Sequence, residues 1–95
     1  MKTIYVHLPA YREPELIPTI KSAIQMARYP ERLRFGICNQ YHPDDTFGKL
    51  NEFLTDPRFR IYDMLYTEAK GLPYARGIIN SMITDEDYVL QLDSH

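Results

Sequence analysis

The sequence of 95 residues lacks the features that mark several classes of protein. Its single cysteine, Cys38, excludes an intramolecular disulfide, and its place inside a predicted strand favours a buried thiol in a reducing compartment over a reactive one. No apolar run approaches the roughly 20 residues of a membrane span, and the first residues lack a signal-peptide core. We therefore expect a soluble, cytoplasmic protein with no membrane partner.

The chain also lacks an excess of charge of one sign. Its 11 basic and 13 acidic residues give a formal net charge of −2, and the basic residues are scattered along the sequence. We therefore expect no nucleic-acid partner. A chain of this length can bury one modest core, and it shows no repeat, linker or low-complexity tract. Residues 1–95 are expected to form one domain or part of one.

Apolar periodicity predicts strands that alternate with helices. Runs rich in β-branched and aromatic residues predict strands at 3–8, 33–39, 59–65 and 88–92. Helical spacing of apolar residues predicts helices from Glu13-Pro14 to Tyr29-Pro30, from Pro73 to Ile83 and, shorter, at 47–54. This alternation favours an α/β fold with a Rossmann-like, mostly parallel sheet and flanking helices. Its ligand crevice is expected at the carboxyl ends of the strands.

Two candidate metal ligands follow the last predicted strand. Asp93 and His95 are one residue apart, so they would lie on the same side of an extended backbone. An oxygen and a nitrogen donor suit a divalent cation such as Mn²⁺ or Mg²⁺, and a diphosphate oxygen commonly completes such a shell. The sequence therefore predicts an incomplete metal site, and we expect the chain to be truncated after it.

Three other loops at strand ends carry groups suited to a nucleotide. Tyr11 offers a flat face for stacking a base, and Asn39 or Gln40 offers a primary amide for the edge of a pyrimidine. Arg76, in the first turn of its predicted helix, would join the helix N-terminus in binding a diphosphate. Gly71 allows the backbone to approach a ligand closely. Together these residues predict one nucleotide site.

Each of these residues also has a purely structural interpretation. In this interpretation Tyr11 covers the first predicted helix, Gly71 ends a strand, and Arg76 lies on a solvated helix face. His7, inside the first strand, is expected to be a satisfied core or edge histidine. His42 and the pair Asp44-Asp45 are expected to form a solvated loop rather than a metal site.

The order of these motifs resembles the nucleotide-binding half of GT-A glycosyltransferases. The resemblance is carried by the segments Pro9-Ala-Tyr-Arg-Glu13, Lys70-Gly-Leu-Pro-Tyr-Ala-Arg76 and Leu90-Gln-Leu-Asp-Ser-His95. The last two segments are similar to the polypeptide hydroxyproline N-acetylglucosaminyltransferase family and its bacterial relatives. The resemblance covers nearly the whole chain, and it implies the N-terminal portion of a GT-A fold.

The resemblance implies a metal-dependent, retaining transferase that moves N-acetylglucosamine from UDP-N-acetylglucosamine to a hydroxyl of a protein or glycan acceptor. By position, Asp93 and His95 would hold the metal bound to the UDP-sugar. Tyr11 and Glu13 would meet the nucleotide, and Arg76 would contact the phosphates. No catalytic base or nucleophile is implied within the chain, because a later segment supplies the acceptor site in GT-A enzymes.

Asn39-Gln40 occupy the place where many GT-A enzymes carry a uracil-binding aspartate. Two other functions remain open. A nucleotidyltransferase would normally show a glycine-rich, basic first loop, whereas residues 9–13 contain no glycine. A non-catalytic nucleotide-binding domain is the third hypothesis.

The GT-A arrangement would also place the fourth strand beside the first, with its other edge normally covered by a later strand. We therefore expect the isolated chain to be inactive as a transferase and to self-associate through the uncovered edge.

Overall fold

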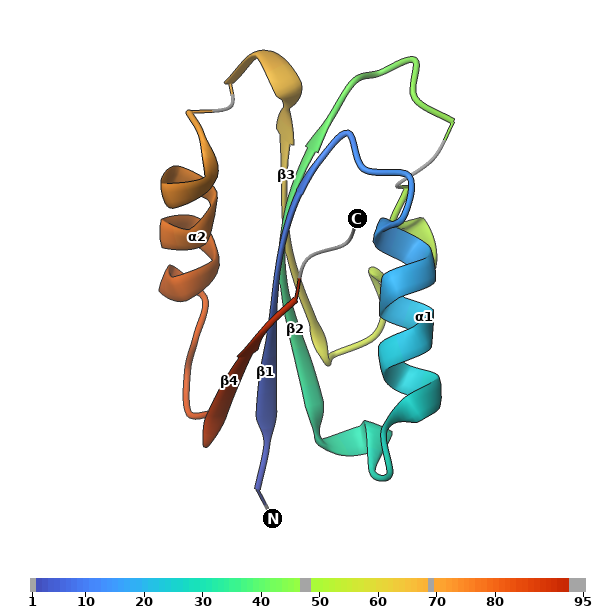
Figure 1. Cartoon of the computed structure of the whole chain (residues 1–95), viewed down its shortest axis with the longest axis vertical. Helices are drawn as coiled ribbons and strands as arrows, with labels where there is room; N and C mark the ends of the chain where they lie inside the picture. The colour runs from blue at the N-terminus through green and yellow to red at the C-terminus, as the bar shows by residue number, and fades with distance from the viewer. Residues whose placement is uncertain (1, 47–48, 69, 93–95) are drawn as a thin grey trace.

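The four strands form one parallel sheet in the order β3-β2-β1-β4. The computed structural model describes residues 2–46, 49–68 and 70–92, and every structural statement below refers to these residues. The strands are β1 Ile4–Tyr11, β2 Leu33–Tyr41, β3 Phe59–Leu65 and β4 Tyr88–Gln91. Helix α1 lies on one face of the sheet and α2 on the other (Figure 1), with bounds Leu16–Met26 and Leu72–Ser81. Short 3-10 turns are η1 Pro30–Arg32, η2 Asn51–Phe53 and η3 Tyr66–Glu68.

The predicted fold class is confirmed, and so is the predicted pairing of β4 with β1. Two strands are longer than predicted. Strand β1 continues through Pro9 to Tyr11, and β2 continues to Tyr41. The N–H of Leu92 donates to the carbonyl of His7, so the backbone of His7, and that of Pro9 two residues later, points toward the β4 side. The described pairing of β1 with β4 ends at Gln91. The absence of an N–H on Pro9 therefore removes no hydrogen bond from this pairing.

Helix α1 begins at Leu16, and the prediction of a start at Glu13-Pro14 was wrong. The carboxylate of Glu13 accepts the N–H of Glu15 at 3.0 Å, which holds the preceding residues in a turn. The proline of the first helical turn is therefore Pro18, where an N–H has no helical partner to lose. In the predicted helix at 47–54 the structure has only η2, and residues 47–48 lie outside the described residues.

The main core lies between α1 and the sheet. It contains fully buried side chains of β1, β2 and α1, namely Val6, Leu8, Phe35, Ile37, Leu16 and Ile20. The ring of Phe59 stacks between those of Phe35 and Phe53, at centroid distances of 4.5 and 4.6 Å. Apolar residues thus hold α1 and the loop before β3 on the same face of the sheet.

A smaller core lies under α2, built from Tyr5, Cys38, Met64, Ala75 and Ile79. The prediction of a buried thiol is confirmed, since Cys38 is fully buried and its Sγ lies 3.9 Å from Sδ of Met64. Burial raises the pKa of this thiol. No helix in the described part of the chain is long and apolar enough to cross a membrane.

Candidate functional site

The candidate site lies at the carboxyl ends of the strands, which all point the same way (Figure 1). From β1 the chain moves outward to β2 and β3, and it then returns over the other face to place β4 on the free side of β1. The direction of winding therefore reverses between β1 and β4. In open α/β sheets, ligands bind in the crevice outside such a reversal.

Tyr11 and Gln40 are register partners at the ends of β1 and β2. The side chain of Tyr11 is 55% exposed, so its ring is accessible for stacking. Gln40 is buried, and its Nε2 donates to the carbonyl of Ala10 at 2.9 Å. The Gln40 amide thus ties the two strand ends together rather than facing solvent.

Asn39 lies on the opposite face of the sheet from Gln40, because neighbouring residues of a strand point to opposite faces. It is buried, and its Nδ2 donates to Oδ1 of Asp63 at 3.1 Å. Asn39 and Asp63 line a polar pocket of about 110 Å³, together with His42, Asp45 and Lys49. Of the two predicted amides, Asn39 is therefore the one that borders an open pocket.

Gly71 lies immediately before α2 and Arg76 lies within it, over the other face of the sheet. Gly71 precedes the helix with φ of 93°, a left-handed conformation that favours glycine. Arg76 is the fifth residue of α2, so the predicted position in the first turn was wrong. It therefore lies just beyond the first turn, whose N–H groups are free of helical partners. Its Nε is buried without a hydrogen-bond partner in the described structure.

Sequence reasoning missed an ion pair at this edge of the sheet. The prediction that Asp45 lies in a solvated turn was wrong, because Asp45 is buried and Arg12 donates to its two carboxylate oxygens at 2.9 and 3.3 Å. The exposed side chain of Asp44 fits the prediction. Arg12 has a left-handed φ of 44°, and its N–H donates to the carbonyl of Gln40 at 2.7 Å. The loops after β1 and β2 are thereby locked together.

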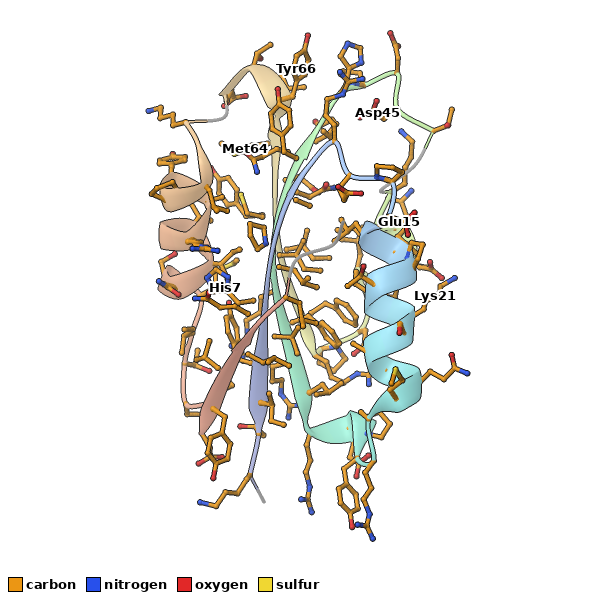
Figure 2. All side chains as sticks on the ribbon, in the orientation of Figure 1. His7, Glu15, Lys21, Asp45, Met64 and Tyr66 are labelled. Atoms are coloured by element: carbon orange, nitrogen blue, oxygen red, sulfur yellow. The ribbon has the colours of Figure 1, made fainter. Side chains whose placement is uncertain are left out.

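Two aromatic contacts extend this ion pair to the end of β3. The guanidinium of Arg12 lies 5.3 Å from the ring centroid of Tyr66, and the ring of His42 lies 4.9 Å from that of Tyr66. His42 is therefore partly covered rather than fully solvated. The hydrogen bonds from Arg12 lower the pKa of Asp45 against the opposing effect of burial, and the N–H of His42 lowers it further. Figure 2 shows Asp45 and Tyr66 at the same end of the sheet.

His7 is buried as predicted, but the prediction that it is satisfied was wrong. Its side chain is fully buried on the α2 face, and neither ring nitrogen makes a hydrogen bond of good geometry within the described residues. Its pKa is lowered, chiefly by burial. No signal in the sequence distinguishes such a histidine from an ordinary core residue.

The predicted metal ligands Asp93 and His95 lie outside the described residues. Among the residues that are described, no group of three or more histidine, cysteine, aspartate or glutamate side chains is arranged to hold a metal ion. Glu13 is placed at the carboxyl edge, with its carboxylate bonded to the backbone of Glu15. Its contact with a nucleotide stays a prediction.

A family model described as "Glycosyltransferase (GlcNAc)" matches residues 3–57 and residues 46–95, which together span nearly the whole chain. A search of the curated proteins finds no match.

Proposed function

The chain belongs to the GlcNAc glycosyltransferase family, and from this premise we propose that it forms the part of a metal-dependent transferase that binds UDP-N-acetylglucosamine. The proposed acceptor is a hydroxyl group of a protein or glycan. The observation that carries the proposal is the family match over nearly the whole chain, and it is supported by Tyr11 and Asn39 at the carboxyl ends of β1 and β2 and by Gly71 at the start of α2.

In this proposal the nucleotide lies across the edge of the sheet. The exposed ring of Tyr11 stacks on the base, and the pocket beside Asn39 and Asp63 supplies amide and carboxylate groups for the base edge or the ribose. The diphosphate lies toward α2, where Gly71 leaves room for backbone contact and Arg76 supplies a cation.

The proposed metal ligands are Asp93 and His95, which follow β4 at the reversal point. A carboxylate oxygen and an imidazole nitrogen form a donor set that suits Mn²⁺ and accommodates Mg²⁺. When bound, the cation would offset the negative charge that develops on the departing diphosphate. The guanidinium of Arg76 would act on the same charge. The ion pair of Arg12 with Asp45 would keep the nucleotide-facing loops in place.

Isothermal calorimetry of the chain with UDP and with ATP, each with Mn²⁺ and with chelator, tests the proposal. We expect UDP to bind more tightly than ATP. UDP binding is expected to require the cation and to be lost in Asp93→Ala and His95→Ala. The matched control is Asp44→Ala, since Asp44 is an exposed carboxylate in another loop at the same edge. Preference for ATP would favour a nucleotidyltransferase, and equal UDP affinity in chelator and in Mn²⁺ would contradict the metal site.

A further inference from the structure

His7 lies in β1 beside the point where the winding of the chain reverses. Its side chain is fully buried and faces α2 (Figure 2), and neither ring nitrogen makes a hydrogen bond of good geometry in the described structure. Its register partner on β4 is Gln91, two residues before Asp93. A buried polar group without a partner destabilises the fold. The groups around the imidazole therefore determine whether it can form a functional hydrogen bond.

A second unpaired group lies on the facing helix. Nε of Arg76 is also buried without a partner, and Asn80 follows Arg76 by one turn on the same side of α2. Burial lowers the pKa of His7. Weak hydrogen bonds with the backbone of Arg76 and the side chain of Asn80 oppose this effect, and the charge of the Arg76 guanidinium adds to it. These groups therefore surround a neutral imidazole.

The two unpaired groups are chemically complementary. A guanidinium has only donors, whereas a neutral imidazole has one donor and one acceptor. The imidazole can therefore accept the Nε–H of Arg76 and donate its own N–H to Asn80 or to the backbone of Arg76. A guanidinium held at Nε keeps its terminal nitrogens free for a planar, two-bond contact with a phosphate. In ligand-free sites such contacts are often long or poorly aligned, and they tighten when the ligand binds.

We propose that His7 is a positioning residue for Arg76, which it holds by accepting the Nε–H so that the guanidinium faces the diphosphate of the bound nucleotide. This role rests on the proposed function. In this role His7 makes β1 part of the phosphate site, although His7 itself contacts no ligand.

The test compares His7→Phe, which keeps a ring but no nitrogen, with His7→Gln, which keeps one donor and one acceptor. Calorimetry in Mn²⁺ would measure UDP, inorganic pyrophosphate and uridine. We expect His7→Phe to weaken UDP and pyrophosphate about tenfold, the scale of a hydrogen bond to a charged group, with uridine unchanged. His7→Gln is expected to stay within about threefold of the parent.

A double-mutant cycle with Arg76→Met separates positioning from general damage. If His7 acts through Arg76, His7→Phe has no further effect once the guanidinium is gone. The matched control is Tyr5→Phe, which removes the hydrogen bond to the carbonyl of Ile79 on the same buried face and is expected to leave UDP affinity unchanged. An unchanged affinity in His7→Phe, or an equal loss in both backgrounds, would overturn the proposal.

A parent chain that binds neither UDP nor pyrophosphate would contradict the proposed function. The contact itself remains testable by ¹⁵N NMR of the imidazole. We expect Arg76→Met to move the shift of one His7 ring nitrogen and to leave His42 unchanged. An imidazole spectrum of His7 that is insensitive to Arg76→Met would overturn the contact.

Discussion

Tyr5 fills the space beside Gly36 that any other side chain at that position would need. A Cβ built on Gly36 would lie 1.9 Å from the Tyr5 hydroxyl oxygen and 2.3 Å from the ring carbon that carries it. The Tyr5 hydroxyl is fixed, because it donates to the carbonyl of Ile79 at 2.7 Å in a buried environment that raises its pKa to about 12. A single glycine in β2 therefore lets one tyrosine link β1 to α2.

We expect Gly36→Ala to lower the free energy of unfolding by about 1–3 kcal/mol, the usual range for overpacking a core. Urea denaturation followed by circular dichroism measures the change. The control is Gly77→Ala in α2, where nothing lies within 4 Å of the new methyl group. That variant is expected to gain about 0.5–1 kcal/mol from helix propensity. A neutral Gly36→Ala variant would show that Tyr5 moves aside without cost.

Tyr11 and Arg76 are predicted to act on different parts of a nucleotide. We expect Tyr11→Ala to weaken UDP but not pyrophosphate, because stacking acts on the base, and Arg76→Ala to weaken both. Each loss should be on the order of 1–3 kcal/mol in calorimetry. Tyr29→Ala is the control, since this exposed tyrosine lies beside η1 at the other end of the sheet. Unchanged UDP affinity in Tyr11→Ala would leave that ring with a structural role alone.

At the scale of elements, one ion pair fixes the connection between α2 and β4. Arg60 of β3 bonds the carboxylate of Glu86 and donates to the carbonyl of Met82 at 3.0 Å. The Glu86 side chain is only 1% exposed. Its burial would raise the pKa, but hydrogen bonds from Arg60, the Thr84 hydroxyl and the Asp85 N–H outweigh this, so the pKa of Glu86 lies below its usual value. The Glu86 carboxylate therefore joins the connection after α2 to β3.

A carboxylate whose pKa is lowered by folding stabilises the protein above its unfolded pKa, and this contribution is lost as the pH falls through the folded pKa. We expect Glu86→Gln to cost on the order of 2 kcal/mol at pH 7, because it leaves the charge of Arg60 without an ionic partner, and less as the pH falls below about 4. Urea denaturation across this pH range measures the difference.

Glu52→Gln is the matched control, because Glu52 pairs with Lys21 at 3.6 Å with both side chains more than half exposed. It should change stability by less than about 0.5 kcal/mol at any pH. A pH-independent cost in Glu86→Gln would contradict the assignment of the effect to charge.

At the scale of the whole molecule, the outer edge of β4 has no paired strand among the described residues. Tyr88, Val89 and Leu90 are each about half exposed. On the α1 face this edge borders an apolar groove of about 710 Å³, between α1 and β4, to which Leu90 and Leu92 contribute. Unpaired backbone groups next to an apolar surface are the setting for pairing between identical strands.

We expect the chain to form dimers or larger species through β4, since an antiparallel pairing of two β4 strands satisfies both edges at once. Light scattering over a range of concentrations measures the association. Val89→Lys places a charge on the edge and is expected to shift the equilibrium toward monomer, whereas Leu54→Lys, at another exposed position, is not. A monomeric parent chain at high concentration would contradict this prediction.

The sequence by itself determined the elements and the edge at which the candidate site lies. Periods of two and of three to four in the apolar residues are local properties, so they identified β3 with its bounds and β1, β2, β4, α1 and α2 within a few residues. Alternation of these elements was enough to predict a parallel sheet and a site at its carboxyl edge. The predicted start of α1 was wrong because a side-chain contact decides it. The carboxylate of Glu13 bonds the backbone just before the helix.

Only the tertiary structure decided which side chains meet. Arg12 and Asp45 are 33 residues apart, and their pairing depends on the register of β1 with β2, which no local pattern encodes. The same register brings the amide of Gln40 to the carbonyl of Ala10, and the packing of the loop after β2 forms the pocket beside Asn39. The burial of His7 against Arg76 requires α2 to cross β1, so its neighbours come from an element about 70 residues away in the chain. Local pattern sets periodicity, whereas contacts between distant residues are set by how the elements pack.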